Sequence, residues 1–117
     1  MTKVFKIPAE RIRQIAVGKG GCIASDRITV DGKRVGFMYR EPPEDDVDSG
    51  WRFMAGDESQ EYMDDPNHLA IYDVNTIANY DPSIIPLLDS PIGSAFEKTT
   101  ESERFMRVTD WEISADE

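Results

Sequence analysis

The chain has 117 residues with 13 Lys and Arg, 23 Asp and Glu and one His, which gives a formal net charge of −10 at pH 7. This length predicts a single domain over residues 1–117, and a hydrophobic content of 39% argues against global disorder. The acidity counts against a nucleic-acid binder, because contact with phosphates needs a basic surface.

Cysteine usage and the N-terminus set further bounds. Cys22 is the only cysteine in the sequence, so no intramolecular disulfide and no cysteine-based zinc site can form. The first residues lack the apolar run of a secretory signal, and no stretch approaches the roughly 20 apolar residues that cross a bilayer. We therefore expect a cytoplasmic protein without membrane contact; export by a dedicated apparatus is the alternative.

The N-terminal third predicts a helix followed by a hairpin. Apolar residues at 9, 12, 15 and 16 share one helical face, with Pro8 at the start and Gly18 at the end. The pair Asp31-Gly32 is typical of a two-residue hairpin turn. We therefore expect strands at about 26–30 and 33–40, with Ile28 opposite Val35.

The remainder predicts further strands separated by short helical turns. Trp51, Phe53 and Ala55 alternate with Arg52 and Met54, which indicates a third strand with both aromatic side chains buried. Further elements are a helical turn within 57–63, a buried strand at 69–74, helical turns at 75–80 and 81–88 begun by Asn75 and Asp81, and strands at 93–97 and 105–111. The order favours an α+β fold with a mostly antiparallel sheet, an N-terminal helix and short helical turns.

No catalytic or metal-binding signature is found. An EF-hand loop starting at Asp45 would place Val47 at a ligand position and Gly56 where the bidentate Glu belongs, so that hypothesis fails, although an irregular carboxylate calcium site stays open. Cys22 and His68 could form a nucleophilic pair, but neither lies in a recognisable signature. We expect no enzyme activity, no cofactor and no metal.

The charge is distributed unevenly along the chain. Residues 1–40 carry a net charge of +6, residues 41–97 carry −13 and residues 98–117 carry −3. A solvated loop is the plain interpretation of the central acidic block, and a docking surface for a basic partner is the functional one. The candidate partner-binding residues are Glu44, Asp45, Asp46 and Asp48, with Asp57, Glu58, Glu61, Asp64 and Asp65 as a second cluster. Neutralising the first four should leave stability nearly unchanged, since substitutions in an exposed loop usually cost little.

Several stretches between residues 21 and 97 resemble a bacterial family. They are Ser25-Asp26-Arg27-Ile28, Val35-Gly36-Phe37-Met38-Tyr39-Arg40-Glu41, Asp48-Ser49-Gly50-Trp51-Arg52-Phe53-Met54-Ala55-Gly56-Asp57-Glu58, Tyr72-Asp73-Val74-Asn75-Thr76 and Leu88-Asp89-Ser90-Pro91-Ile92-Gly93. The family resembled is number thirty-three among the immunity proteins of polymorphic toxin systems, formerly a domain of unknown function. The resemblance implies an α+β fold and neutralisation of a cognate toxin by binding, without assigned catalytic residues.

Two function classes follow from these observations. The first is a non-catalytic protein-binding module, an immunity protein whose partner is a basic toxin domain. The second is a small-ligand-binding or regulatory domain. The identity of the toxin and the oligomeric state do not follow from the residues.

Overall fold

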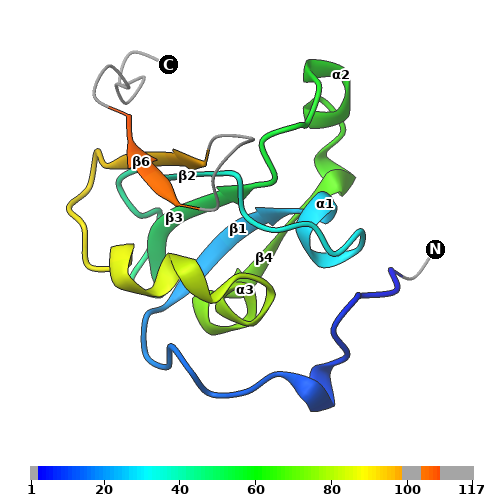
Figure 1. Ribbon diagram of the computed structural model, residues 1–117, viewed down its shortest axis with the longest axis horizontal. Helices are drawn as coiled ribbons and strands as arrows, with labels where there is room; N and C mark the ends of the chain where they lie inside the picture. Colours follow the sequence, from blue (N-terminus) through cyan, green and yellow to red (C-terminus); the bar gives the residue numbers. More distant parts are fainter. Residues whose placement is uncertain (1–2, 99–103, 109–117) are drawn as a thin grey trace.

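The protein is represented by a computed structural model that describes residues 3–98 and 104–108 (Figure 1). Within these residues the chain forms six strands, three α-helices and three 3₁₀ helices. In chain order they are η1 (Ala9–Arg11), β1 (Gly21–Ser25), α1 (Asp26–Thr29), β2 (Phe37–Arg40), β3 (Asp48–Met54), α2 (Gln60–Met63), η2 (Pro66–His68), β4 (Leu69–Asp73), α3 (Val74–Tyr80), η3 (Pro82–Leu87), β5 (Ala95–Lys98) and β6 (Phe105–Arg107). The expected α+β class is confirmed.

The strands form one mixed sheet in the order β4-β1-β3-β2-β5-β6. β1 and β3 pair in parallel, and the other neighbouring pairs are antiparallel. The expectation of a mostly antiparallel sheet was wrong: the sheet is mixed, because β3 lies between β1 and β2 and pairs with β1 in parallel. That placement joins residues far apart in the sequence, so local patterns do not reveal it.

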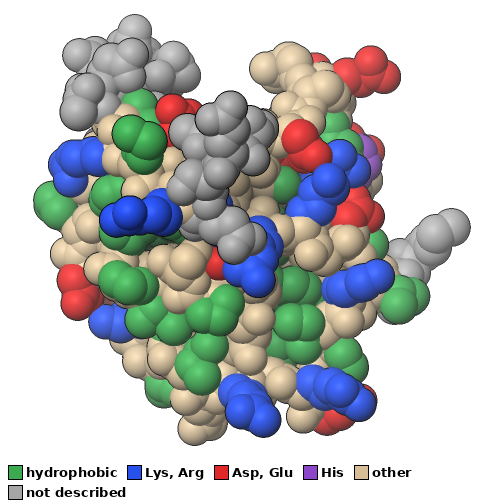
Figure 2. Space-filling model, viewed as in Figure 1, with side chains coloured by type: hydrophobic (Ala, Val, Ile, Leu, Met, Phe, Trp, Pro, Cys, Tyr) green, Lys and Arg blue, Asp and Glu red, His purple; other side chains and the backbone are tan. Residues whose placement is uncertain are grey.

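The core lies between the sheet and the helices α3 and η3, which cover one face of it (Figure 1). Cys22 and Ala24 of β1, Trp51 and Phe53 of β3, and Met38 of β2 point into this core, and all are buried. The predicted burial of both aromatic side chains on β3 is therefore confirmed. The helix-covered face in Figure 2 displays Lys and Arg side chains across its width, with Asp and Glu mainly toward the rim.

The expected hairpin at Asp31-Gly32 does not form. Residues Asp26–Thr29 are the helix α1, which begins after Ser25, whose hydroxyl accepts a hydrogen bond from the Arg27 backbone N–H. Gly32 has the positive φ of 79° that the turn prediction required, but its N–H donates to the Ile28 carbonyl and so closes a helix end. Ile28 and Val35 are both buried without being strand partners.

The expected N-terminal helix over 9–17 is also wrong, since helical structure is limited to η1, Ala9–Arg11. The following backbone is held by side chains of α3. Asn75 Oδ1 accepts the N–H groups of Ile15 and Ala16, each at 2.8 Å, and Asn79 Oδ1 accepts the N–H of Arg13 at 2.9 Å. These tertiary hydrogen bonds compete with a local helix for the same backbone donors.

The C-terminal half follows the sequence more closely. The helical turn α2, the strand β4 and the start of η3 after the Asp81 cap lie within the expected ranges, and β5 overlaps its expected range and ends one residue later, at Lys98. Three details differ: β4 is an edge strand and not buried, α3 is capped by Asp73 instead of Asn75, and β6 ends at Arg107, with positions 109–111 outside the described residues. Across the described ranges, no helix is long and apolar enough to cross a membrane.

Candidate partner-binding groove

The face of the sheet opposite α3 carries a buried charge cluster centred on Arg52. Because side chains alternate along a strand, Arg52 points away from the core that its neighbours Trp51 and Phe53 fill, yet its side chain is only 2% exposed. Its Nε donates to Glu41 Oε2 at 2.5 Å, and its Nη1 and Nη2 donate to the two Asp48 carboxylate oxygens at 2.9 and 2.8 Å. The bidentate geometry makes this a strong ion pair.

The electrostatics of the cluster favour its charged form. Hydrogen bonds from Arg52 hold the pKa of Asp48 well below its usual range, and the carboxylates of Asp48 and Glu41 raise the pKa of the Arg52 guanidinium. A buried guanidinium without such partners would be strongly destabilising. Arg52 and Asp48 therefore stay ionised across the physiological pH range, and the cluster fixes the start of β3 against Glu41.

The acidic loop, defined as residues 41–47, is ordered by its own side chains. Asp48 Oδ2 accepts the Glu44 N–H at 2.9 Å, and Asp45 Oδ1 accepts the N–H groups of Val47 and Asp48 at 3.0 and 2.9 Å. The loop also reaches β1, because the Val47 carbonyl accepts the Gly21 N–H at 2.6 Å. A Cβ on Gly20 would stand 2.9 Å from that carbonyl, so glycine there permits the approach.

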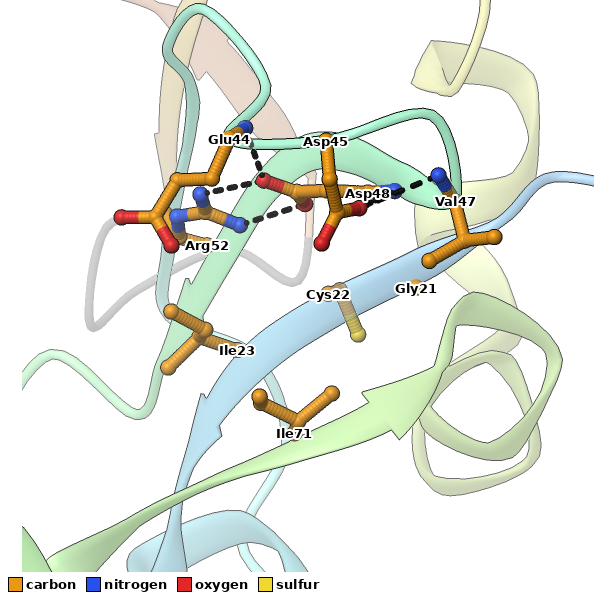
Figure 3. Close-up of a pocket in the computed structure, with 9 residues that line it drawn as sticks. All are labelled: Gly21, Cys22, Ile23, Glu44, Asp45, Val47, Asp48, Arg52 and Ile71. Atoms are coloured by element: carbon orange, nitrogen blue, oxygen red, sulfur yellow. Dashed lines mark hydrogen bonds and ion pairs between the residues drawn. The ribbon is translucent and has the colours of Figure 1, made fainter.

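A pocket of about 140 Å³ opens between the acidic loop and strands β1 and β4 (Figure 3). It continues into a wider and more open depression of about 830 Å³ beside the β4 edge. We name the two together the groove. Its lining includes the apolar side chains of Ile23, Val47 and Ile71 and the carboxylates of Glu44, Asp45, Asp46, Asp48 and Asp73, with Lys19, Arg40 and Arg52 as the cations.

The structure divides the first predicted acidic cluster. Glu44, Asp45 and Asp46 are exposed at the rim of the groove. The carboxylates of Glu44 and Asp46 make no hydrogen bond or ion pair within residues 3–98 and 104–108. Asp48 was expected to be an exposed loop carboxylate, but its side chain is 13% exposed and holds Arg52. Neutralising all four residues would therefore disturb the fold, contrary to the expectation from the sequence.

The second predicted cluster lies at the other end of β3 and is not joined to the first. Asp57 forms ion pairs with Arg27 at 2.8 Å and with Lys33 at 3.4 Å. The Glu58 carboxylate accepts the N–H groups of Ala55 and Gly56. Asp65 caps η2, Asp64 accepts a hydrogen bond from the Gln60 side chain, and Glu61 is exposed. These residues mainly stabilise the turns that follow β3.

Sequence reasoning missed the groove residues Arg52, Ile71 and Asp73. Arg52 carried a usable signal, because it is the one basic residue within the acidic block 41–97 and stands between two buried aromatic residues. Ile71 and Asp73 carried none, since only the strand order shows that β4 is an edge. A continuous apolar run such as residues 69–74 is equally consistent with a central strand and with an edge strand.

The residues considered for chemistry are not brought together. Cys22 is buried, and burial raises the pKa of its thiol far above the usual range. Cys22 pairs across the sheet with Tyr72 and not with His68. The His68 ring instead stacks on the ring of Tyr62, with 3.9 Å between the ring centroids. Within the described ranges, no three His, Cys, Asp or Glu side chains gather to hold a metal ion.

The fold and the groove thus define a small α+β domain with a mixed sheet and a preformed, acid-rimmed surface groove. The model of the immunity protein Imm33 domain family matches residues 22–109, and the chain belongs to this family. This confirms the resemblance found in the sequence. No curated protein and no solved structure matches the chain.

Proposed function

We propose that the protein neutralises a cognate toxin by binding a basic surface of it with the acidic rim of the groove. Membership of the immunity family supports the toxin-neutralising role. The observation that carries the choice of surface is the pair Glu44 and Asp46, whose exposed carboxylates have no partner within the described residues. Such groups are free to meet Lys or Arg of another protein.

The ordering of the acidic loop strengthens this proposal. The hydrogen bonds of Asp45 and Asp48 hold the loop backbone before any partner arrives. A preordered loop loses less conformational entropy on binding than a flexible one. The clustered negative charge then accelerates encounter with a basic partner and rejects acidic ones.

The shape of the groove also favours a macromolecular partner. The enclosed part, about 140 Å³, is smaller than the roughly 300–1,000 Å³ of typical small-molecule pockets, and the larger part is open. A basic toxin surface that normally holds phosphate groups suits this rim, because carboxylates can take the place of phosphates.

The test uses toxin domains encoded beside this gene in its native genome. Each is expressed in a bacterial host with and without the protein, and viability is measured. We expect the protein to restore growth against one of them. Death of the host despite full expression of the protein, for every adjacent toxin, would overturn the proposed role.

The surface is tested with two matched double variants, whose association rates with the toxin are measured on purified proteins at two ionic strengths. Glu44→Gln with Asp46→Asn removes two charges from the rim, and Glu61→Gln with Asp64→Asn removes two charges at the far end of β3. Only the first should slow association with the toxin, and wild-type association should weaken as salt rises, because the screening length is about 10 Å at 0.1 M ionic strength. Equal association rates for the two double variants would contradict the assignment of the rim.

A further inference from the structure

The outer edge of β4 lies along the groove and exposes backbone groups that have no strand partner among the described residues. Within residues 3–98 and 104–108, β4 ends the sheet and pairs only with β1. The Val74 N–H donates to the Gly20 carbonyl at 2.9 Å, so the antiparallel alternation directs the backbone groups of Tyr72 and Ala70 toward β1. The same alternation directs the N–H and C=O of Ile71, and the N–H of Asp73, outward from the sheet.

Natural proteins usually protect such an edge. Here its central side chain, Ile71, is apolar and 79% exposed, with no charge or proline within Leu69–Tyr72 to discourage pairing. The Leu69 N–H is already used, since it donates to the Pro66 carbonyl. The open edge is therefore short and centred on Ile71 and Asp73, so main-chain bonds alone would give little affinity.

Side chains next to this edge supply the missing specificity. Ile71 is directly opposite Ile23 of β1, and both line the groove. An added residue opposite Ile71 would place its side chain on the same face and extend this apolar row. Asp73, two residues along, is exposed on that face, and Asp46 lines the same depression. A basic side chain two positions from the apolar one would meet these carboxylates.

We propose that the partner adds an extended segment to the β4 edge, with an apolar side chain opposite Ile71 and a Lys or Arg two residues away opposite Asp73. This inference rests on the proposed function, because it names how the toxin is held. The charge of the rim selects the occupant: a basic segment is attracted by Asp73, Asp46 and Glu44, whereas an acidic one is repelled. Strand addition is a common mode of peptide recognition.

The experiment uses peptide probes with the full-length protein, and so needs no toxin. A short capped peptide of sequence Lys-Thr-Val-Thr-Lys, named here the basic peptide, is titrated while backbone amide exchange is followed by NMR. With Val opposite Ile71, it places a Lys opposite Asp73 in either strand direction. We expect the amides of Ile71 and Asp73 to become protected. The matched acidic peptide, Glu-Thr-Val-Thr-Glu, should not protect them. The basic peptide with N-methylated Val and Lys amides should not protect them either, because its remaining edge would place Thr opposite Ile71.

Two variants locate the site on the protein. Ile71→Lys places a charge on the edge and should weaken binding of the basic peptide about tenfold. Met106→Lys changes a 60% exposed apolar residue on β6, at the opposite edge of the sheet, and should leave binding unchanged. Thermal unfolding of both variants checks that each is folded, as the exposure of the two positions predicts.

The outcomes separate this inference from the proposed function. Absence of protection at Ile71 and Asp73, protection at β6 instead, or equal binding of the acidic peptide would overturn strand addition. Protection of the same amides in concentrated protein without peptide would also overturn it, because the occupant would then be a second copy. If the wild-type protein restores growth against a toxin but the peptide does not protect the β4 amides, strand addition is wrong and the proposed function stands. If the peptide protects the β4 amides but no toxin is neutralised, the toxin-neutralising role is wrong and peptide binding at the edge stands.

Discussion

The charge cluster around Arg52 gives the sharpest stability prediction. Asp48→Asn removes the ionised partner of a side chain that is 2% exposed, and Glu41 then remains as its only carboxylate partner within the described residues. Loss of one partner from a buried ion pair typically costs 3–5 kcal/mol; because Glu41 retains part of the compensation, we expect about 2–3 kcal/mol. In urea this corresponds to a midpoint lower by about 1–2 M.

The pH dependence of the same variant checks the cause. The folded-state pKa of Asp48 is lowered by its hydrogen bonds with Arg52, so its stabilising contribution is present above its ordinary value of 3.8 and is lost as the pH falls toward the folded-state pKa. The difference between wild type and Asp48→Asn should therefore shrink from about pH 7 to about pH 3.

The assay is equilibrium urea unfolding followed by tryptophan fluorescence at both pH values. Asp46→Asn is the matched control, since this exposed loop carboxylate has no partner within the described residues and its change should stay within about 0.5 kcal/mol. Equal midpoints for the two variants, or a difference that does not shrink in acid, would refute the reasoning.

Two further predictions concern the core. Trp51→Ala should cost about 3–5 kcal/mol in urea unfolding, because the indole is 1% exposed and its N–H donates to the Leu88 carbonyl at 3.1 Å; a loss below that of a surface change would refute its structural role. Asp81→Asn should destabilise by about 3–5 kcal/mol, since Asp81 is fully buried and accepts hydrogen bonds from Lys98 and the Val35 N–H. Burial raises the pKa of Asp81, but the hydrogen bonds from Lys98 and Ser83 and the charge of Lys98 together outweigh burial, so the net shift of the pKa is downward. The loss of stability in Asp81→Asn should therefore also narrow as the pH falls below about 4, which thermal melts across that range would check.

The edge strand β4 shows why part of the candidate site could not be predicted. Its run of apolar residues predicted a strand correctly but suggested full burial, whereas Ile71 is 79% exposed. Burial of a strand depends on whether a second strand pairs with its other edge. For β4, the order of the whole sheet leaves only β1 as a neighbour within the described residues. The groove formed with the acidic loop has the same origin.

Local signals succeeded where one short segment determines its own conformation. Alternation around Trp51 and Phe53 gave β3 and its buried face, and Asp81 followed by Pro82 gave the start of η3. They failed where one signal serves two structures. Gly32 has the positive φ that a hairpin turn needs, but the Ser25 cap upstream directs the preceding residues into a helix, which the same glycine then terminates.

The α+β class, the family, the net negative charge and the aromatic core of β3 could be predicted from the residues alone, because composition, alternation and local motifs need no knowledge of long-range contacts. Three features became visible only in the folded chain: the parallel pairing of β1 with β3, the burial of Arg52 between Glu41 and Asp48, and the exposure of the β4 edge beside the groove. Each of these depends on contacts between residues distant along the chain, whose energies no local pattern contains.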